Sequence, residues 1–262
     1  MKCMQRIEHD GMVFYQSALF RAFPNLVHAV TTRHGGVSPA PFDSLNLSSH
    51  VGDSPENVTQ NLERFHRVLG LAQSATVDAH QAQADRVAQV TLAERGTRIQ
   101  GVDGLITNLR GIPLMLRFAD CVPILLYDPT HQAIGIAHAG WRGTVGKVVT
   151  NTVKAMQNAF GTEPSDLIAA ICPSIGPCCY EIGADVREQV EAAFPGTSEL
   201  LLPRNGTLHL DLWQANALQL RGLGVEQIDV AEVCTADNTN DFYSWRREKT
   251  HTGRFAAVIA LR

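Results

Sequence analysis

Residues 117–147, RFADCVPILLYDPTHQAIGIAHAGWRGTVGK, constrain the fold of this chain more than any other segment. They contain two apolar runs, at residues 122–127 and 133–137, separated by the stretch Asp-Pro-Thr-His-Gln. Two apolar runs of this length joined by a turn predict a β-hairpin. The first run has no polar residue, which is typical of a strand that is buried on both faces.

Two reactive side chains lie at the open end of this expected hairpin. Cys121 immediately precedes the first run and His138 follows the second. Because a hairpin brings its two ends together, we expect the thiol and the imidazole to face one site. Gly140 and Gly143 then predict a tight turn into a helix, where backbone N–H groups can hold an anion.

The Cys121–His138 pair is compatible with two kinds of chemistry. In one, Cys121 is a nucleophile and His138 is its base, as in a cysteine hydrolase. In the other, both side chains ligate a metal, since a thiolate and an imidazole together suit Zn²⁺. The residues alone leave both possibilities open.

The rest of the chain predicts strands and helices in mixed order. Strands are expected at residues 12–16, 26–31, 102–107, 112–118, 167–171, 208–210, 228–233 and 255–261. Helices are expected at residues 54–69, 144–160, 184–194 and 211–221, with another helix-to-strand passage through Glu94 and Gly96. Hairpin-length turns favour mixed sheets covered by helices over a doubly wound parallel sheet. With no repeat and no linker, residues 1–262 are expected to form a single domain.

Charge and cysteine usage exclude several classes of protein. The net charge is −4 and there are no cationic blocks, which argues against nucleic-acid and membrane-surface partners. The N-terminal residues contain no apolar signal segment, so a cytoplasmic location is expected. The six cysteines include no CxxC pair, so apart from Cys121 they are expected to be reduced, mostly buried thiols.

Basic and aromatic side chains in the turn-rich segments form a second group of candidates. The arginines are Arg33, Arg142, Arg246 and Arg247, and together they would suit a phosphate or a carboxylate. The adjacent segment FYSW, which ends in Trp245, offers a flat surface for an aromatic base. The ten histidines include no HxH pair, which argues against a multicopper oxidase.

The motifs of the chain resemble those of the YfiH-like, laccase-domain family, in the same order from about residue 30 to the C-terminus. They are TTRHGGVS, SLNLSSHVGD, RFADCVPILLYDP, AHAGWRG, PSIGPCCYEIG and FYSWRREKTHTGR. The resemblance implies an α/β (α+β) fold, an αββα four-layer sandwich with mixed sheets. It also implies a metal site with one cysteine and two histidines, in which Cys121 and His138 are two of the ligands.

The third ligand is where the sequence departs from the family pattern. The family has QVHGxRV at the position of residues 81–87, so Gln83 stands in the place of the metal-binding histidine. A glutamine carbonyl is a poor ligand for Zn²⁺ beside a thiolate. His80 lies three residues earlier, and on a regular strand this odd offset would turn it to the opposite face.

The resemblance implies a purine nucleoside phosphorylase that acts on adenosine, inosine and related nucleosides with phosphate, with adenosine deamination as a second activity. The implied cofactor is zinc, or copper. For this reaction we expect the phosphate and ribose contacts to come from Arg142 and Arg33 with Arg246 or Arg247, and the surface against the base to come from residues 242–245, which include Trp245. The alternatives are a copper-dependent phenol oxidase, a Cys121/His138 hydrolase of cell-wall precursors, and a nucleoside-binding protein without catalytic activity.

Overall fold

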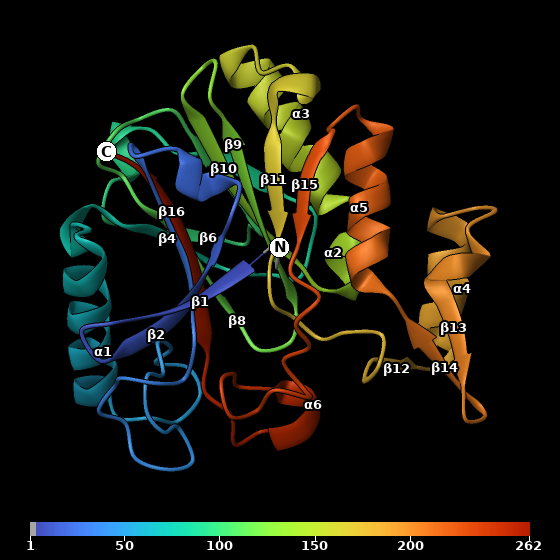
Figure 1. Cartoon of the computed structure of the whole chain (residues 1–262), viewed down its shortest axis with the longest axis horizontal. Helices are drawn as coiled ribbons and strands as arrows, with labels where there is room; N and C mark the ends of the chain where they lie inside the picture. Colours follow the sequence, from blue (N-terminus) through green and yellow to red (C-terminus); the bar gives the residue numbers. More distant parts are fainter. Residues whose placement is uncertain (1–3) are drawn as a thin grey trace.

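The structure is a computed structural model that describes residues 4–262, and its strands form two large sheets and a small one (Figure 1). The first sheet has the order β1-β2-β3-β16-β8-β4-β6. These strands are β1 (Met4–His9), β2 (Met12–Ser17), β3 (Leu26–Thr31), β16 (Phe255–Leu261), β8 (Leu114–Phe118), β4 (Val77–His80) and β6 (Arg98–Gln100). The pairs β4–β8 and β4–β6 are parallel and the other pairs of these strands are antiparallel, so this sheet is mixed.

The second large sheet has the order β15-β11-β9-β10-β7-β5 and is also mixed. Its strands are β15 (Gln227–Val230), β11 (Ile168–Ile171), β9 (Val122–Asp128), β10 (Ala133–Ala139), β7 (Gly104–Thr107) and β5 (Val87–Gln89). The small sheet lies to one side and contains β12 (Glu181–Ile182), β14 (Thr207–Leu210) and β13 (Leu201–Arg204), beside α4 (Ala184–Ala193).

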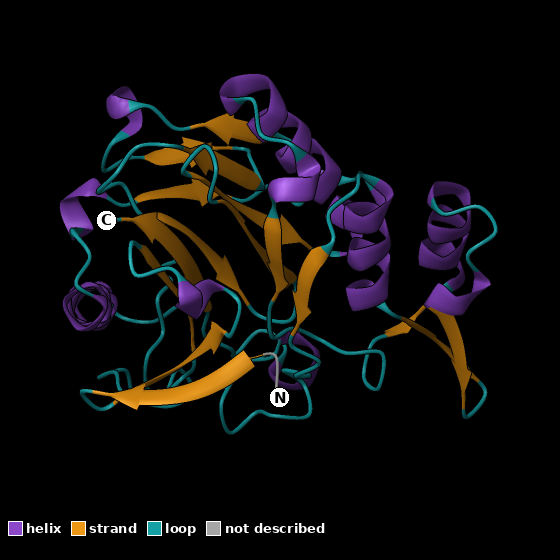
Figure 2. Ribbon diagram, turned by 45° about the horizontal axis from the view of Figure 1, so that its top comes forward, coloured by secondary structure: helices purple, strands orange, loops and turns teal. Residues whose placement is uncertain are grey.

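Three apolar clusters define the layers. One fills the space between the two large sheets and includes Phe118 and Tyr127. A second joins the outer face of the first sheet to α1 (Pro55–Leu69) through Phe65. The third joins the outer face of the second sheet to α3 (Val148–Phe160) and α5 (Leu212–Gly222). The expected αββα sandwich is therefore confirmed, and Figure 2 shows the strands stacked between the helices.

The predicted hairpin is the central pair of the second sheet. β9 and β10 are buried throughout, and their antiparallel register pairs His138 with Pro123 and Ala139 with Val122. Cys121, the residue before β9, therefore lies at the same end as His138. At the opposite end, Asp128 closes the turn by accepting hydrogen bonds from the backbone N–H groups of Thr130 and His131 at 2.9 and 3.0 Å.

Two predicted elements differ from the structure. The helix expected at residues 144–160 is divided into α2 (Trp141–Val145) and α3, because Lys147 adopts a left-handed conformation with φ 66°. The helix-to-strand passage before Gly96 contains no α-helix; it forms β4, β5 and a single 3₁₀ turn at Leu92–Glu94. None of the helices in residues 4–262 has the length and hydrophobicity needed to span a membrane.

A buried histidine makes the stability of this fold depend on pH. His28, on β3, accepts a hydrogen bond from the backbone N–H of Ser17 at 2.9 Å, and burial lowers its pKa to about 4. In the unfolded chain, the same imidazole binds a proton near pH 6.5. The contribution of His28 to the free energy of unfolding is therefore fully present above that pH and is lost as the pH falls toward 4. We expect His28 to account for about 3 kcal/mol of this loss. In His28→Gln, the free energy of unfolding measured with urea should fall by correspondingly less between pH 7 and pH 4. A fall as large as that of the wild type would contradict the assignment.

Candidate functional site

A cavity of about 610 Å³ opens at the end of the β9–β10 hairpin that carries Cys121 and His138. Its walls include His80 at the end of β4, Arg117 on β8, and residues of α2 and of α6 (Trp245–Glu248). Both sheets and the two short helices thus contribute side chains to one space, which we call the Cys121 cavity. Of the residues singled out in the sequence, Gln83, Cys121, His138, Arg142, Trp245 and Arg246 line it.

His138 is fixed in orientation by Asp103, which is fully buried. The Asp103 carboxylate accepts a hydrogen bond from His138 Nδ1 at 2.7 Å, which leaves Nε2 as the ring nitrogen available to the cavity. Burial opposes a charge on the ring, but Cys121 and Asp103 outweigh it and raise the pKa of His138 to about 9. Gly140 leaves room for the thiol, because a Cβ there would lie 2.9 Å from Cys121 Sγ.

Asp103 also shapes the turn that carries Gln83. Its carboxylate accepts hydrogen bonds from the backbone N–H groups of Ala82, Gln83 and Ala84 at 3.0, 3.1 and 2.9 Å. Gln83 is held there with a left-handed φ of 54°. One buried carboxylate therefore positions both His138 and the residue that replaces the family's second histidine. Asp103 was not predicted from the sequence, although it is a single acidic residue just before the apolar run Leu-Ile-Thr.

The residues present do not fit the zinc site that the family implies. Cys121 and His138 supply two suitable donors, and the Asp103 contact is the carboxylate support that metal-binding histidines usually have. Gln83 supplies only a neutral amide oxygen, and that oxygen already accepts a hydrogen bond from Arg142 Nη1 at 3.3 Å. A catalytic zinc site normally has three protein ligands, so this set is one ligand short.

His80 lies on the wall of the same cavity, contrary to the expectation from strand alternation. β4 ends at His80 and Gln83 lies in a turn, so the alternation of a regular strand does not extend between them. Within residues 4–262, however, His80, Cys121 and His138 are not among the side chains gathered closely enough to hold one metal ion.

Restoring the missing histidine should create a metal site. In Gln83→His, we expect the affinity for Zn²⁺ to rise at least about tenfold, because an imidazole replaces the amide oxygen beside Cys121 and His138. Competition with a chromophoric chelator measures this affinity. Gln83→Ala, which also removes the amide but adds no imidazole, should show no gain. A gain that survives when Cys121 is also replaced by alanine would contradict the assignment.

Five arginines line the Cys121 cavity: Arg98, Arg117, Arg142, Arg246 and Arg254. Two of them share a carboxylate, since Asp78 binds Arg98 Nε at 2.8 Å and Arg117 Nη1 at 2.6 Å. Within the described residues 4–262, the other three have no carboxylate partner for their guanidinium groups. The cavity therefore presents uncompensated positive charge, which suits an anionic ligand.

Arg33 and Arg247 lie outside this cavity. They line a separate recess of about 830 Å³, which we call the Arg33 recess. There, Arg33 forms an ion pair with Glu248 at 2.8 Å and Arg247 pairs with Asp237 at 3.2 Å. The structure thus brings Arg142 and Arg246 together but does not bring Arg33 and Arg247 to the same site.

Three aromatic side chains border the Cys121 cavity: Trp141, Tyr180 and Trp245. Trp245 is 47% exposed, whereas its neighbours Phe242 and Tyr243 are fully buried core residues. The Arg246 guanidinium carbon lies 5.1 Å from the centre of the Tyr180 ring. Of the three aromatic residues in the FYSW segment, only Trp245 is therefore placed to contact a ligand in the cavity. The position of Tyr180 in the cavity wall was not predicted from the sequence.

Asp120 anchors the segment that carries Trp245 and Arg246. Its carboxylate accepts hydrogen bonds from Thr235 Oγ1 at 2.7 Å, Ser244 Oγ at 3.0 Å and the Arg246 backbone N–H at 2.6 Å. Asp120 itself has a left-handed φ of 82°, and burial raises its pKa. The residue before Cys121 therefore fixes the opposite wall of the cavity, a role that the sequence did not reveal.

Comparison with known proteins relates nearly the whole chain to the YfiH-like, laccase-domain family. The family described as "Multi-copper polyphenol oxidoreductase laccase" matches residues 27–262. The "Purine nucleoside phosphorylase YlmD" of Geobacillus stearothermophilus is 39% identical over 251 residues, covering 92% of each chain. The crystal structure of YlmD from G. stearothermophilus covers 100% of both chains with a TM-score of 0.93 at 37% identity. That of the Bacillus licheniformis hypothetical protein YfiH also covers 100% of both, with a TM-score of 0.92 at 31% identity.

Proposed function

Because the chain belongs to the YfiH-like, laccase-domain family, we propose that it is a purine nucleoside phosphorylase, which transfers ribose from a nucleoside to phosphate. The observation that carries this proposal is the Cys121 cavity itself. It combines three arginines that lack carboxylate partners among the described residues with an oriented histidine and three aromatic side chains. The relatives' name, purine nucleoside phosphorylase, supports the same activity.

The reaction joins a phosphate oxygen to C1′ of the ribose and breaks the bond between C1′ and N9 of the purine. The electron pair of that bond leaves with the purine, which takes up a proton. Catalysis therefore requires an anion site next to C1′ and a proton donor next to the base. We assign the proton transfer to His138 Nε2, since Asp103 occupies Nδ1 and holds the ring in place.

Two of these three arginines, Arg142 and Arg246, are assigned different roles according to their contacts. The Arg142 guanidinium donates to the neutral amide of Gln83 and lies over the Trp141 ring, and within residues 4–262 it forms no ion pair, so its charge is available to phosphate. Arg246 donates to the backbone carbonyls of Cys179 and Glu181, which fixes its guanidinium against Tyr180. We assign phosphate binding to Arg142 and a wall against the base or ribose to Arg246.

Arg142→Ala should raise the KM for phosphate by about 10–100-fold, because it removes a charge-assisted contact worth about 1.5–3 kcal/mol. Steady-state kinetics at saturating inosine measure this value. Arg247→Ala removes the same charge from the Arg33 recess and should leave the KM for phosphate within about twofold of wild type, as expected for a surface charge. Equal effects of the two substitutions would contradict the placement of phosphate.

The proposed function is tested by analysing the products formed from inosine and adenosine with and without phosphate. We expect equal amounts of free base and ribose-1-phosphate, and no release of base when phosphate is omitted. Free ribose would indicate hydrolysis. Thermal stabilisation by nucleoside without any product would indicate a binding protein that lacks the activity. Either result would refute the proposal.

We propose that adenosine deamination, the second activity the family implies, is weak or absent in this chain. Deamination at purine C6 requires an activated water, which a metal supplies in deaminases, and Gln83 leaves the ligand set incomplete. In the same assay, adenosine should yield adenine and little inosine. Inosine formation at a rate equal to phosphorolysis would contradict this part of the proposal.

A further inference from the structure

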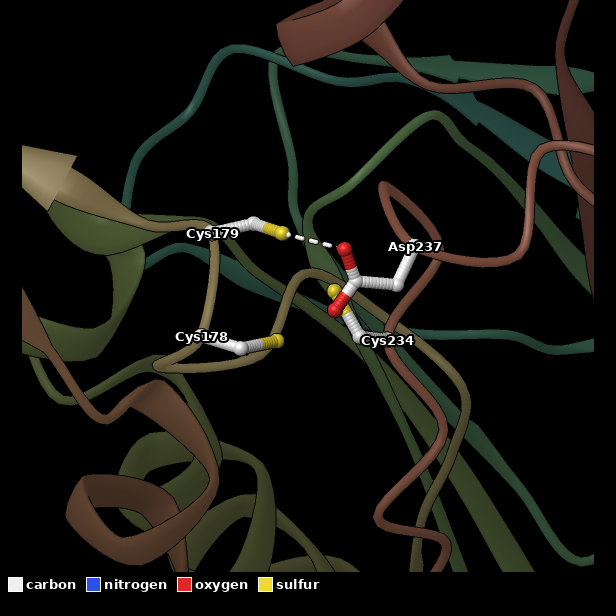
Figure 3. Close-up of side chains that lie close together, drawn as sticks. All are labelled: Cys178, Cys179, Cys234 and Asp237. Carbon is white, nitrogen blue, oxygen red and sulfur yellow. Dashed lines mark hydrogen bonds between the residues drawn. The ribbon is translucent and has the colours of Figure 1, made fainter.

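A second group of possible ligands lies outside the Cys121 cavity. It contains Cys178, Cys179, Cys234 and Asp237, which we call the cysteine cluster. Within the described part of the chain, this is the one group of three or more histidine, cysteine or acidic side chains gathered closely enough to hold a metal ion. Their sulfur and oxygen atoms all lie within 4.8 Å of one another, and Figure 3 shows the side chains turned toward a common space.

Two segments that are distant in the sequence form the cluster, and the backbone holds them together. The Ser174 N–H donates to the Val233 carbonyl at 3.1 Å, and the Thr235 N–H donates to the Ser174 carbonyl at 3.0 Å. The chain then turns, with the N–H of Cys179 bonded to the Gly176 carbonyl at 3.0 Å. Because of this turn, both adjacent cysteines face Cys234, which they could not do on a regular strand.

We propose that the cysteine cluster is a binding site for one thiophilic divalent cation of the Zn²⁺ class, with three sulfur ligands and one carboxylate oxygen. Tetrahedral zinc with bonds of about 2.3 Å to sulfur places its ligands about 3.8 Å apart. The cluster atoms already lie within 4.8 Å, so small side-chain movements suffice. Three cysteines and one carboxylate also form a complete set, unlike Cys121, His138 and Gln83.

The surroundings of the cluster suit a charged ion. Arg247 Nη2 lies 3.4 Å from Cys179 Sγ and 3.2 Å from Asp237 Oδ1. Four anionic ligands around one divalent cation leave two negative charges, and the Arg247 guanidinium offsets one of them. The Gly176 N–H donates to Cys234 Sγ at 3.2 Å, as backbone amides do at bound thiolates. Asp237 also lines the Arg33 recess, which gives an ion a path from solvent.

An ion at this position would join the two segments that wall the Cys121 cavity. Tyr180 directly follows Cys179, and α6 with Trp245 and Arg246 follows Asp237 along the chain. Each cysteine that ligates the ion releases its thiol proton to solvent, and no electron transfer is involved. The role of such an ion is therefore to fix the cavity walls, and it takes no part in the ribose transfer.

The test uses the full chain with Cys121→Ala, so that the cavity thiol contributes no signal. Purified anaerobically and titrated with Co²⁺, this protein should bind one ion per chain and develop the near-ultraviolet absorption of a thiolate bound to Co²⁺. Zn²⁺ should then displace Co²⁺ and remove that absorption. Cys172→Ala, which removes a buried thiol outside the cluster, is the matched control and should leave the absorption unchanged.

Adding Cys178→Ser or Cys234→Ser to the Cys121→Ala protein should lower the absorption, because one of the three thiolate ligands is lost, and should weaken Zn²⁺ binding at least about tenfold. Because Cys178 is exposed, its substitution keeps the test valid if the buried Cys234 cannot be replaced without unfolding. The proposal is overturned if the Cys121→Ala protein shows no thiolate–Co²⁺ absorption, or if neither serine substitution lowers that absorption. A disulfide within the cluster, found by mass spectrometry in protein that binds no ion, would also overturn it.

Discussion

His138→Ala should lower kcat for inosine phosphorolysis by about 10²–10⁴-fold, the usual contribution of a general acid. Asp103 holds the ring by Nδ1 and directs Nε2 toward the cavity, so the substitution removes the assigned proton donor. The protein should remain folded, because alanine leaves the hairpin backbone and its register unchanged. Rapid-quench or steady-state assays at saturating inosine and phosphate measure the change.

The same hairpin supplies a matched control. His131 lies at the opposite end, where its Nδ1 bonds to Asp128 at 2.8 Å in a second histidine–carboxylate pair. His131→Ala should leave kcat unchanged, since this end of the hairpin is remote from the cavity. If His131→Ala and His138→Ala reduced kcat equally, the loss would reflect damage to the hairpin, and the assignment of His138 would be wrong.

Asp103→Ala should lower both stability and activity. The carboxylate is fully buried and accepts hydrogen bonds from three backbone N–H groups and from His138, so its removal leaves four donors without a partner. Breaking a buried charged network of this kind costs about 3–5 kcal/mol of unfolding free energy. We also expect kcat to fall by at least about 10²-fold, because the ring loses its orientation.

Asp128→Ala separates these two effects. Asp128 is also fully buried and accepts from two backbone N–H groups and from His131, so urea unfolding should show a comparable loss of stability. Its kcat, measured at a temperature where the variant is folded, should equal that of wild type. A normal kcat in Asp103→Ala would show that Asp103 serves the fold alone.

Most of the fold could be predicted from the sequence because the strong signals are local. The apolar runs of β9 and β10 and the caps of α1, from Ser54 to Gly70, appear where periodicity and turn residues place them. The break between α2 and α3 was missed because valines continue the helical spacing on both sides of Lys147. β4 and β5 were missed because they are short and flank an irregular turn that Asp103, far along the chain, holds in place.

The candidate site was only partly predictable for a related reason. Cys121 and His138 could be paired because a hairpin fixes which residues face each other across two strands. Nothing in the local sequence distinguishes Arg246, which lines the cavity, from Arg247, which lies in the other recess. That difference depends on long-range packing of the loops, as does the approach of Cys234 to Cys178.

Phosphorolysis in the Cys121 cavity requires phosphate and nucleoside to bind there together. A crystal structure of the protein with phosphate and a non-reacting inosine analogue tests this claim most directly. We predict phosphate within hydrogen-bonding distance of the Arg142 guanidinium, C1′ of the ribose beside it, and the purine between His138 and the rings of Tyr180 and Trp245. Phosphate and nucleoside found in the Arg33 recess, with the Cys121 cavity holding only water, would contradict it.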